Sequence, residues 1–98
     1  MVTRFVLQPG AKIPGATLDQ IEDAIDKLED TDAVRVVHGN HWLECSRVAN
    51  GTVLRMSWDL AIGNAPNSTG EPIPYSYGTV TRGRNIASRR LVERYGVQ

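Results

Sequence analysis

The chain has 98 residues, of which 41% are hydrophobic and 22% charged, ordinary values for one globular domain that exclude a wholly disordered chain. Eleven basic and eleven acidic residues give a formal net charge of zero, and the one cysteine, Cys45, excludes an internal disulfide and a cysteine-rich zinc site. No apolar run approaches the roughly 20 residues that cross a bilayer, and the first residues do not resemble a signal peptide. We therefore expect one cytoplasmic domain, residues 1–98, without a membrane segment.

A short strand and a helix are expected first. Residues 2–8 alternate like a strand, and a turn-rich loop with two Pro-Gly pairs follows. Thr17 and Gln20 have the spacing of a capping box, and the apolar residues after them recur at helical intervals. The pattern predicts a helix that begins near Thr17 and ends at Thr31 and Asp32.

The stretch from Val34 to Trp58 is expected to form a three-stranded antiparallel meander. Gly39-Asn40 and Asn50-Gly51 are both suited to two-residue hairpin turns. These turns fix a register that places seven apolar residues on one face of the sheet: Val34, Val36, Leu43, Cys45, Leu54, Met56 and Trp58. The opposite face then carries polar and charged side chains, among them a charge ladder of Arg35, Glu44 and Arg55, and four apolar ones: Val37, Trp42, Val48 and Val53.

A loop, a strand and a second helix complete the chain. Residues 59–74 show no period and are rich in turn-forming residues, which predicts a long loop. Residues 75–82 alternate like a further strand. The last helix is expected over residues 85–96, capped by Asn85, with four residues on its buried side: Ala87, Leu91, Val92 and Tyr95.

These elements predict an α+β domain in the order β-α-β-β-β-β-α. Its antiparallel sheet would consist of the three-stranded meander plus one or two additional strands, packed with two helices. The expected core consists of Phe5, Leu18, Ile21, Ile25, Leu28, Val34, Val36, Leu43, Cys45, Leu54, Met56, Trp58 and Leu91.

The first predicted helix is strongly acidic. Residues 17–32 carry a net charge of −6, although like charges four residues apart on a helix are mildly unfavourable. Such a surface favours docking to a protein with a basic surface, and the alternative is a solvated face made acidic for solubility. The carboxylates that we assign to a partner-binding surface are Asp19, Glu22, Asp23, Asp26, Glu29 and Asp30.

The last predicted helix has the opposite charge. Residues 82–98 carry a net charge of +4, and arginine makes planar, bidentate contacts with phosphate. The residues that could follow a nucleic-acid backbone are Arg82, Arg84, Arg89, Arg90 and Arg94. In another interpretation, this helix meets the acidic helix of a second copy, which would give a symmetric homodimer.

His38, His41 and Cys45 are the residues whose side chains could take part in catalysis or metal binding. His38 and His41 flank the Gly39-Asn40 turn and should face each other, as an acid and base of a small ribonuclease or as two metal ligands. No third ligand can be assigned near them, so we expect neither a metal nor a cofactor. Cys45 lies on the predicted core face and is expected to be a buried, unreactive thiol.

Trp42 is the last candidate for partner binding. With its valine neighbours it lies on the face opposite the main core. Either the last helix covers this face, or the side chains form an exposed apolar patch with a charged rim, which is typical of a binding surface.

The sequence favours a non-enzymatic protein-interaction module. Small domains with separated charges and no catalytic motif are typical of stoichiometric inhibitors, immunity proteins and phage or mobile-element accessory proteins. The assignment to this class is an analogy. It would dock through the acidic helix, the Trp42 face, residues 59–74 or a combination of them. The alternative is a nucleic-acid-binding protein that uses the arginines of the last helix, and a small ribonuclease is the third possibility.

Overall fold

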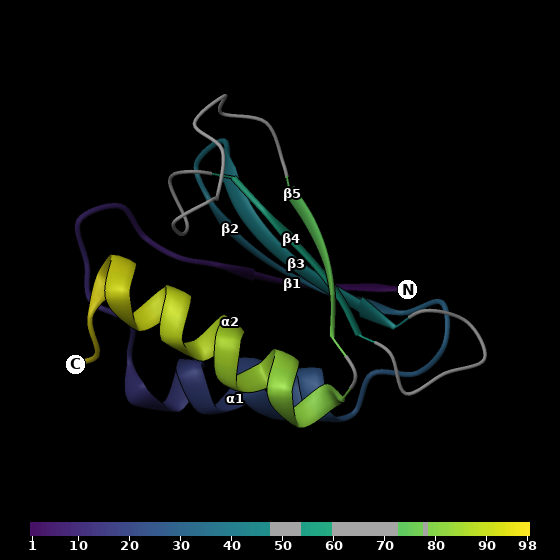
Figure 1. The fold of residues 1–98 in the computed structure, drawn as a ribbon. Coiled ribbons are helices and arrows are strands. Elements are labelled where there is room, and N and C mark those ends of the chain that lie inside the picture. Colours follow the sequence, from purple (N-terminus) through teal and green to yellow (C-terminus); the bar gives the residue numbers. More distant parts are fainter. Residues whose placement is uncertain (48–53, 60–72, 78) are drawn as a thin grey trace.

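The described residues form five strands and two helices. The computed structural model describes residues 1–47, 54–59, 73–77 and 79–98. Its elements are β1 (Val2–Val6), α1 (Gly15–Asp26), β2 (Ala33–His38), β3 (His41–Arg47), β4 (Leu54–Trp58), β5 (Ile73–Tyr77) and α2 (Val80–Tyr95). The strands lie in the order β1-β2-β3-β4-β5, and both helices lie on the same side of the sheet (Figure 1). The predicted α+β class and element order are confirmed.

The sheet is mixed, so the prediction of an antiparallel sheet is wrong at one strand pair. β1 runs parallel to β2, with Val2 opposite Ala33 and Val6 opposite Val37, whereas the other three pairs are antiparallel. The reason is the connection between the two strands. A chain that leaves one strand, passes through a helix and returns beside the same strand arrives in the parallel direction, and α1 is such a crossover.

The register of the meander is confirmed on both sides of β3. Val36 lies opposite Leu43, and Leu43 lies opposite Trp58. Gly39 has a φ of 61°, which suits the first central position of a type II′ hairpin turn, where glycine adopts this conformation without steric cost. The second predicted turn, Asn50-Gly51, lies outside the described residues, as do Val48 and Val53.

α1 begins two residues earlier and ends sooner than predicted. Pro14 occupies the N-cap position, where no side chain makes a capping hydrogen bond, so the predicted capping box of Thr17 and Gln20 is wrong. Proline suits the start of a helix because its φ is preset. Lys27 forms the C-cap, and the following residues turn through Thr31, whose φ is 73°. This turn brings the chain to Ala33, where pairing with β1 begins.

The last strand and helix also have different ends. β5 begins at Ile73, inside the predicted loop 59–74, of which residues 60–72 lie outside the described part of the chain. β5 ends at Tyr77, and residues 80–82, which the pattern assigns to the strand, belong to α2 instead. The Thr79 hydroxyl oxygen accepts a hydrogen bond from the backbone N–H of Arg82 at 3.1 Å, so Thr79 is the N-cap and the predicted cap, Asn85, lies inside the helix. Threonine favours both strands and N-caps, which explains the wrong interpretation.

The core lies between the sheet and the two helices. Eleven of the predicted core residues are buried, while Phe5 and Leu18 are partly buried against them. Ala87 is buried as expected, but Val92 is 39% exposed. Leu7 and Ile13 also belong to the core. Ile13 pairs with Val97, which follows α2, and this contact between distant segments has no local sequence pattern.

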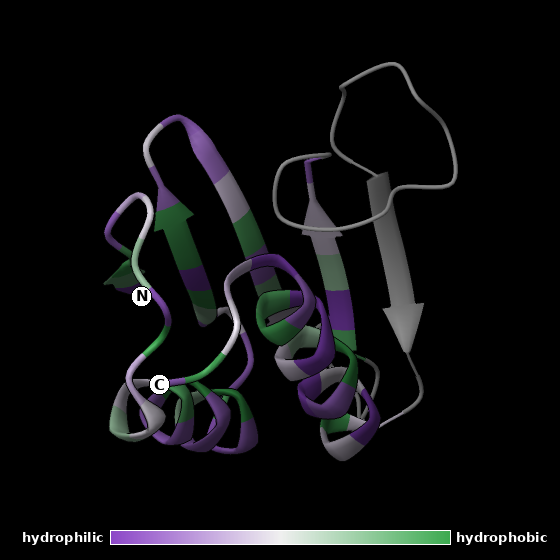
Figure 2. Cartoon of the chain, turned by 90° about the vertical axis from the view of Figure 1, so that its left-hand side faces the viewer, coloured by the Kyte–Doolittle hydropathy of each residue, from purple (hydrophilic) through white to green (hydrophobic). Residues whose placement is uncertain are grey.

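Figure 2 shows α1 and α2 side by side below the strands, with hydrophobic and hydrophilic bands alternating along the described strands. In the described part of the chain, neither helix combines the length and apolar character needed to cross a bilayer.

Candidate binding surface

Within the described part of the chain, no helix packs on one face of the sheet. The buried residues of β2, β3 and β4 share a core with residues of both helices, such as Ile25 and Leu91. Side chains alternate along a strand, so the remaining positions lie on the opposite side of the sheet. We call this side the open face, and its main residues are Val2, Arg4, Val6, Arg35, Val37, Trp42, Glu44, Ser46, Arg55 and Ser57. The interpretation in which the last helix covers Trp42 is therefore wrong.

The open face is organised in rows that cross the strands. Val6 lies opposite Val37, which lies opposite Trp42, so three apolar residues form one row. Arg4 lies opposite Arg35, which lies opposite Glu44, and these form a charged row beside it. Directly opposed side chains in neighbouring strands are close enough to interact. The surface thus combines an apolar stripe with an adjacent row of mostly positive charge.

Contacts within this surface hold Arg35 in place. Its guanidinium carbon lies 4.8 Å from the centre of the Trp42 ring, and its Nη1 atom lies 3.5 Å from Oε2 of Glu44. The Arg35–Glu44 step of the predicted ladder is confirmed, whereas Arg55 lies opposite Ser46 rather than Glu44. A shallow groove of about 430 Å³ runs beside these residues, lined by Arg4, Val6, Arg35, Val37, Gly39, Asn40, His41 and Trp42. Arginine and apolar side chains thus share the lining of one groove.

Four of the six predicted acidic residues, Asp19, Glu22, Asp23 and Asp26, line one open groove together with Arg84, and several of them also make contacts within the fold. Glu22 accepts a hydrogen bond from the Ser88 hydroxyl at 2.8 Å, and Asp26 makes an ion pair with Arg84 at 2.6 Å, so both bind α2. Asp23 pairs with Lys27 at 3.0 Å. The other three residues are Asp19 on α1 and, beyond the end of the helix, Glu29 and Asp30.

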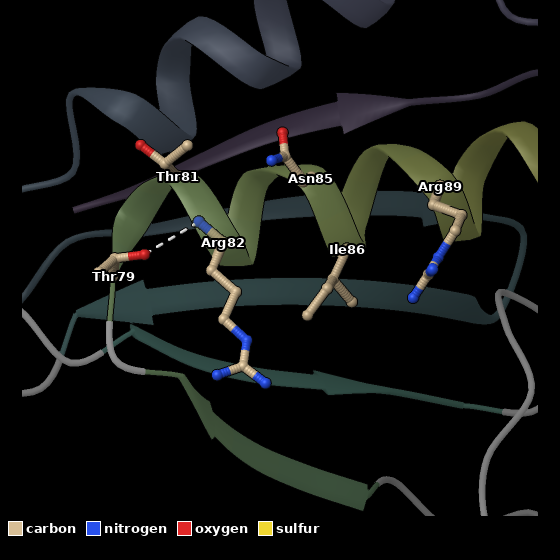
Figure 3. Close-up of a pocket in the computed structure, with 6 residues that line it drawn as sticks. All are labelled: Thr79, Thr81, Arg82, Asn85, Ile86 and Arg89. Atoms are coloured by element: carbon tan, nitrogen blue, oxygen red, sulfur yellow. Dashed lines mark hydrogen bonds between the residues drawn. The ribbon is translucent and has the colours of Figure 1, made fainter.

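The five predicted arginines are likewise divided. Arg84 pairs with Asp26 of α1. The guanidinium carbon of Arg90 lies 5.3 Å from the centre of the Trp58 ring, and its Nη1 atom lies 3.9 Å from Oε2 of Glu93. The guanidinium carbon of Arg94 lies 5.9 Å from the centre of the Tyr95 ring. Arg82 and Arg89 line a groove of about 620 Å³ on α2, together with Thr79, Thr81, Asn85 and Ile86 (Figure 3). In this view the side chains of Arg82 and Arg89 extend to the same side of the helix, with Ile86 between them.

The two histidines face each other across the hairpin, as predicted, but their rings contact different residues. His38 packs edge-on against Tyr95 at 5.1 Å, and the Nδ1 atom of His41 lies 2.9 Å from Oδ2 of Asp59. Burial raises the pKa of the Tyr95 hydroxyl, an effect that Arg94 opposes. These contacts join the hairpin to the end of α2 and to the residue after β4. No cluster of three potential metal ligands exists among the described residues.

Sequence reasoning missed Asp59 and Tyr95 as partners of the histidines. Asp59 follows Trp58, and its backbone N–H donates to the Trp42 carbonyl at 3.2 Å, which extends the β3–β4 pairing by one step. The predicted register could have indicated that Asp59 lies near the hairpin. Tyr95 was assigned to the buried side of the last helix, but nothing local indicates that this side meets His38.

Cys45 is buried in the centre of the sheet, in agreement with the prediction. None of its surface is exposed, and burial, together with the charge of Glu44, raises the pKa of the thiol from 9.0 to about 12. The reactive thiolate is therefore scarce at neutral pH.

Cys45 is expected to resist thiol reagents in the native protein and to react after unfolding in urea. Because the unfolded thiol ionises first as the pH rises, the free energy of unfolding should fall between pH 9 and about 12. The slope from this group reaches about 1.4 kcal/mol per pH unit. Labelling with a chromogenic disulfide, and urea titrations of the wild type and of Cys45→Ala over this range, measure both effects. Rapid labelling of the native protein at pH 8 would contradict the assignment.

No family model matches the chain, and neither a curated protein nor a solved structure matches it. Any functional assignment therefore depends on the geometry of the described residues.

Proposed function

We propose that this protein is a non-enzymatic protein-interaction module that binds its partner through the open face of the sheet. The observation that carries the proposal is an apolar row that no described helix covers, in which Trp42 continues Val6 and Val37 beside a groove lined in part by Arg4 and Arg35. Tryptophan and arginine are the residues that most often dominate protein–protein binding energy. Arg35 is already ordered by Trp42 and Glu44, which lowers the entropy that binding would cost.

The charge of the open face indicates the character of the partner. Among the described residues of β1 to β4 on this face, Arg4, Arg35 and Arg55 accompany one carboxylate, Glu44. Asp59, which follows β4 opposite Trp42, is buried and paired with His41. Charge complementarity therefore favours a partner with an acidic rim around an apolar contact. The acidic residues of α1 support docking less well, because Glu22 and Asp26 are engaged with α2. An inhibitor, an immunity protein or an accessory protein remains the kind of module proposed.

Affinity capture from the host lysate tests the proposal with matched variants. Trp42→Ala should lose a stoichiometric protein partner that the wild type captures at low salt. Val92→Ala, which truncates an exposed apolar residue on α2, should retain it. If Trp42→Ala captures the partner as well as the wild type, the open face is not the binding surface. If the partner is lost in an Asp19→Lys, Asp23→Lys double variant but not in Trp42→Ala, the acidic helix is the binding surface.

The groove on α2 supports nucleic-acid binding as a second candidate function. Arg82 and Arg89 line one groove and extend to the same side of the helix, and arginine is a common contact of phosphate groups. The same capture experiment distinguishes this function. Recovered nucleic acid that disappears at moderate salt and in an Arg82→Ala, Arg89→Ala double variant would favour it, whereas a nuclease-resistant protein partner would not.

A further inference from the structure

β1 is an edge strand whose backbone groups are available on one side. Among the described residues it forms a ladder only with β2. The Ala33 N–H donates to the Met1 carbonyl at 3.0 Å, and the Leu7 N–H donates to the Val37 carbonyl at 2.8 Å, so odd-numbered residues face β2. Peptide groups alternate in direction along a strand. The N–H and C=O groups of Val2, Arg4 and Val6 therefore point to the edge.

Arg4 is the one charged side chain of β1, and its two neighbours on the same face are apolar. Val2 is 48% and Val6 is 66% exposed, and the strand contains no proline. Proteins usually shield an exposed apolar edge, because it can template pairing with another strand. The edge is also continuous with the open face. Val6 continues the apolar row of Trp42, and Arg4 continues the charged row of Arg35.

We propose that the edge of β1 binds an extended segment of an acidic partner, which adds to the sheet as a further strand. The inference rests on the proposed function and specifies its contact. A strand beside β1 would place every second side chain on the open face, next to Val2, Arg4 and Val6. The matching segment has five residues: the first and fifth are apolar, the third is acidic, and the second and fourth can be of any type. This pattern reads the same in both directions, so it fits a parallel or an antiparallel strand.

The charge of Arg4 argues against a second copy of this chain as the occupant. A symmetric antiparallel pair of β1 strands with full overlap would place Arg4 directly opposite Arg4 of the other copy. Like charges directly opposite each other destabilise a strand pair, whereas opposite charges stabilise it. Arg4 therefore disfavours self-pairing and selects a strand with a carboxylate at its centre.

Two capped peptides with the cores Val-Thr-Glu-Thr-Val and Val-Thr-Lys-Thr-Val test the inference at low ionic strength. The wild type should bind the glutamate peptide about threefold to tenfold more tightly than the lysine peptide, and Arg4→Glu should reverse the preference. Hydrogen exchange followed by NMR should show slower exchange at the amides of Val2, Arg4 and Val6. The amides of Thr3 and Phe5, which face β2, should be much less affected.

A proline at position 6 separates strand addition from side-chain docking. Val6→Pro removes an outward N–H without removing a β1–β2 hydrogen bond, and Val6→Ala removes the same apolar contact while keeping the N–H. Circular dichroism checks that both variants fold. We expect Val6→Pro to bind the glutamate peptide far more weakly than Val6→Ala does. If the two bind equally, or if the edge amides are not protected, strand addition is wrong.

The remaining outcomes separate this inference from the proposed function. A peptide that binds without protecting the edge amides, and whose binding is lost in Trp42→Ala, would overturn strand addition but support docking on the open face. Absence of binding at about 1 mM peptide would overturn the edge inference alone, since capture of a partner through Trp42 does not depend on it. Edge protection that grows with protein concentration in the absence of peptide would instead indicate self-pairing and overturn the acidic occupant.

Discussion

Replacing Trp58 by alanine is expected to remove about 3–5 kcal/mol from the free energy of unfolding. The Trp58 side chain is 1% exposed at the end of β4, and the guanidinium of Arg90 lies over its ring. Its truncation would leave a large cavity between the sheet and α2. A domain of this length has about 5–15 kcal/mol of stability in total, so Trp58→Ala should lose a large fraction of it.

The second tryptophan provides the matched control. Trp42 lies on the neighbouring strand but on the open face, where its main contact is the Arg35 guanidinium. Trp42→Ala should therefore cost about 1 kcal/mol, the value of a partly exposed cation–π contact with some lost apolar burial. Guanidinium titrations followed by circular dichroism measure both variants. Equal losses would mean that something packs on the open face, which would contradict its assignment as a binding surface.

Replacing Gly83 by alanine is expected to destabilise the protein by about 1–2 kcal/mol, although alanine is the better helix former by about 1 kcal/mol. Gly83 is buried in the second turn of α2, and an added Cβ would lie 3.0 Å from Cγ of Leu54 and closer still to one of its methyl groups. Leu54 is fully buried, so it cannot move aside cheaply. Thermal and urea unfolding of Gly83→Ala measure the net effect.

Two further variants identify the cause of that loss. Gly15→Ala adds a methyl group to α1 where nothing lies within 4 Å, so its stability should equal or slightly exceed that of the wild type. In a Leu54→Ala background, the space above Gly83 is open, and Gly83→Ala should become neutral or stabilising. A stabilising effect of Gly83→Ala in the wild type would show that α2 does not approach β4 so closely.

Local patterns were sufficient for much of this fold. The element order, the alternation of β2 to β4 and the first hairpin turn all depend on contacts between residues close in sequence. Once the turns are known, the register follows, and with it the face that carries Val36, Leu43 and Trp58. The pair of Arg35 with Glu44 and the burial of Cys45 follow from the same register, which is why they could be predicted.

The ends of the elements were less predictable, because a residue type can suit two structures. Thr79 suits a strand and an N-cap, and only the position of α2 against β4 and β5 selects the cap. Pro14, rather than Thr17, begins α1 because the loop before it is tied to the C-terminal residues through Ile13 and Val97. Such contacts join residues far apart in sequence and leave no periodic signal.

The candidate surface was decided by tertiary structure. The sequence by itself shows that Trp42 shares a sheet face with Val37, but whether a helix covers this face depends on where α2 crosses the sheet. Packing places α2 beside α1, because both helices have apolar residues to bury and only one face of the sheet is apolar throughout. That arrangement also pairs Asp26 with Arg84 and thereby uses part of the acidic surface within the fold. Charge and pattern are properties of the chain, but exposure is a property of the packed molecule.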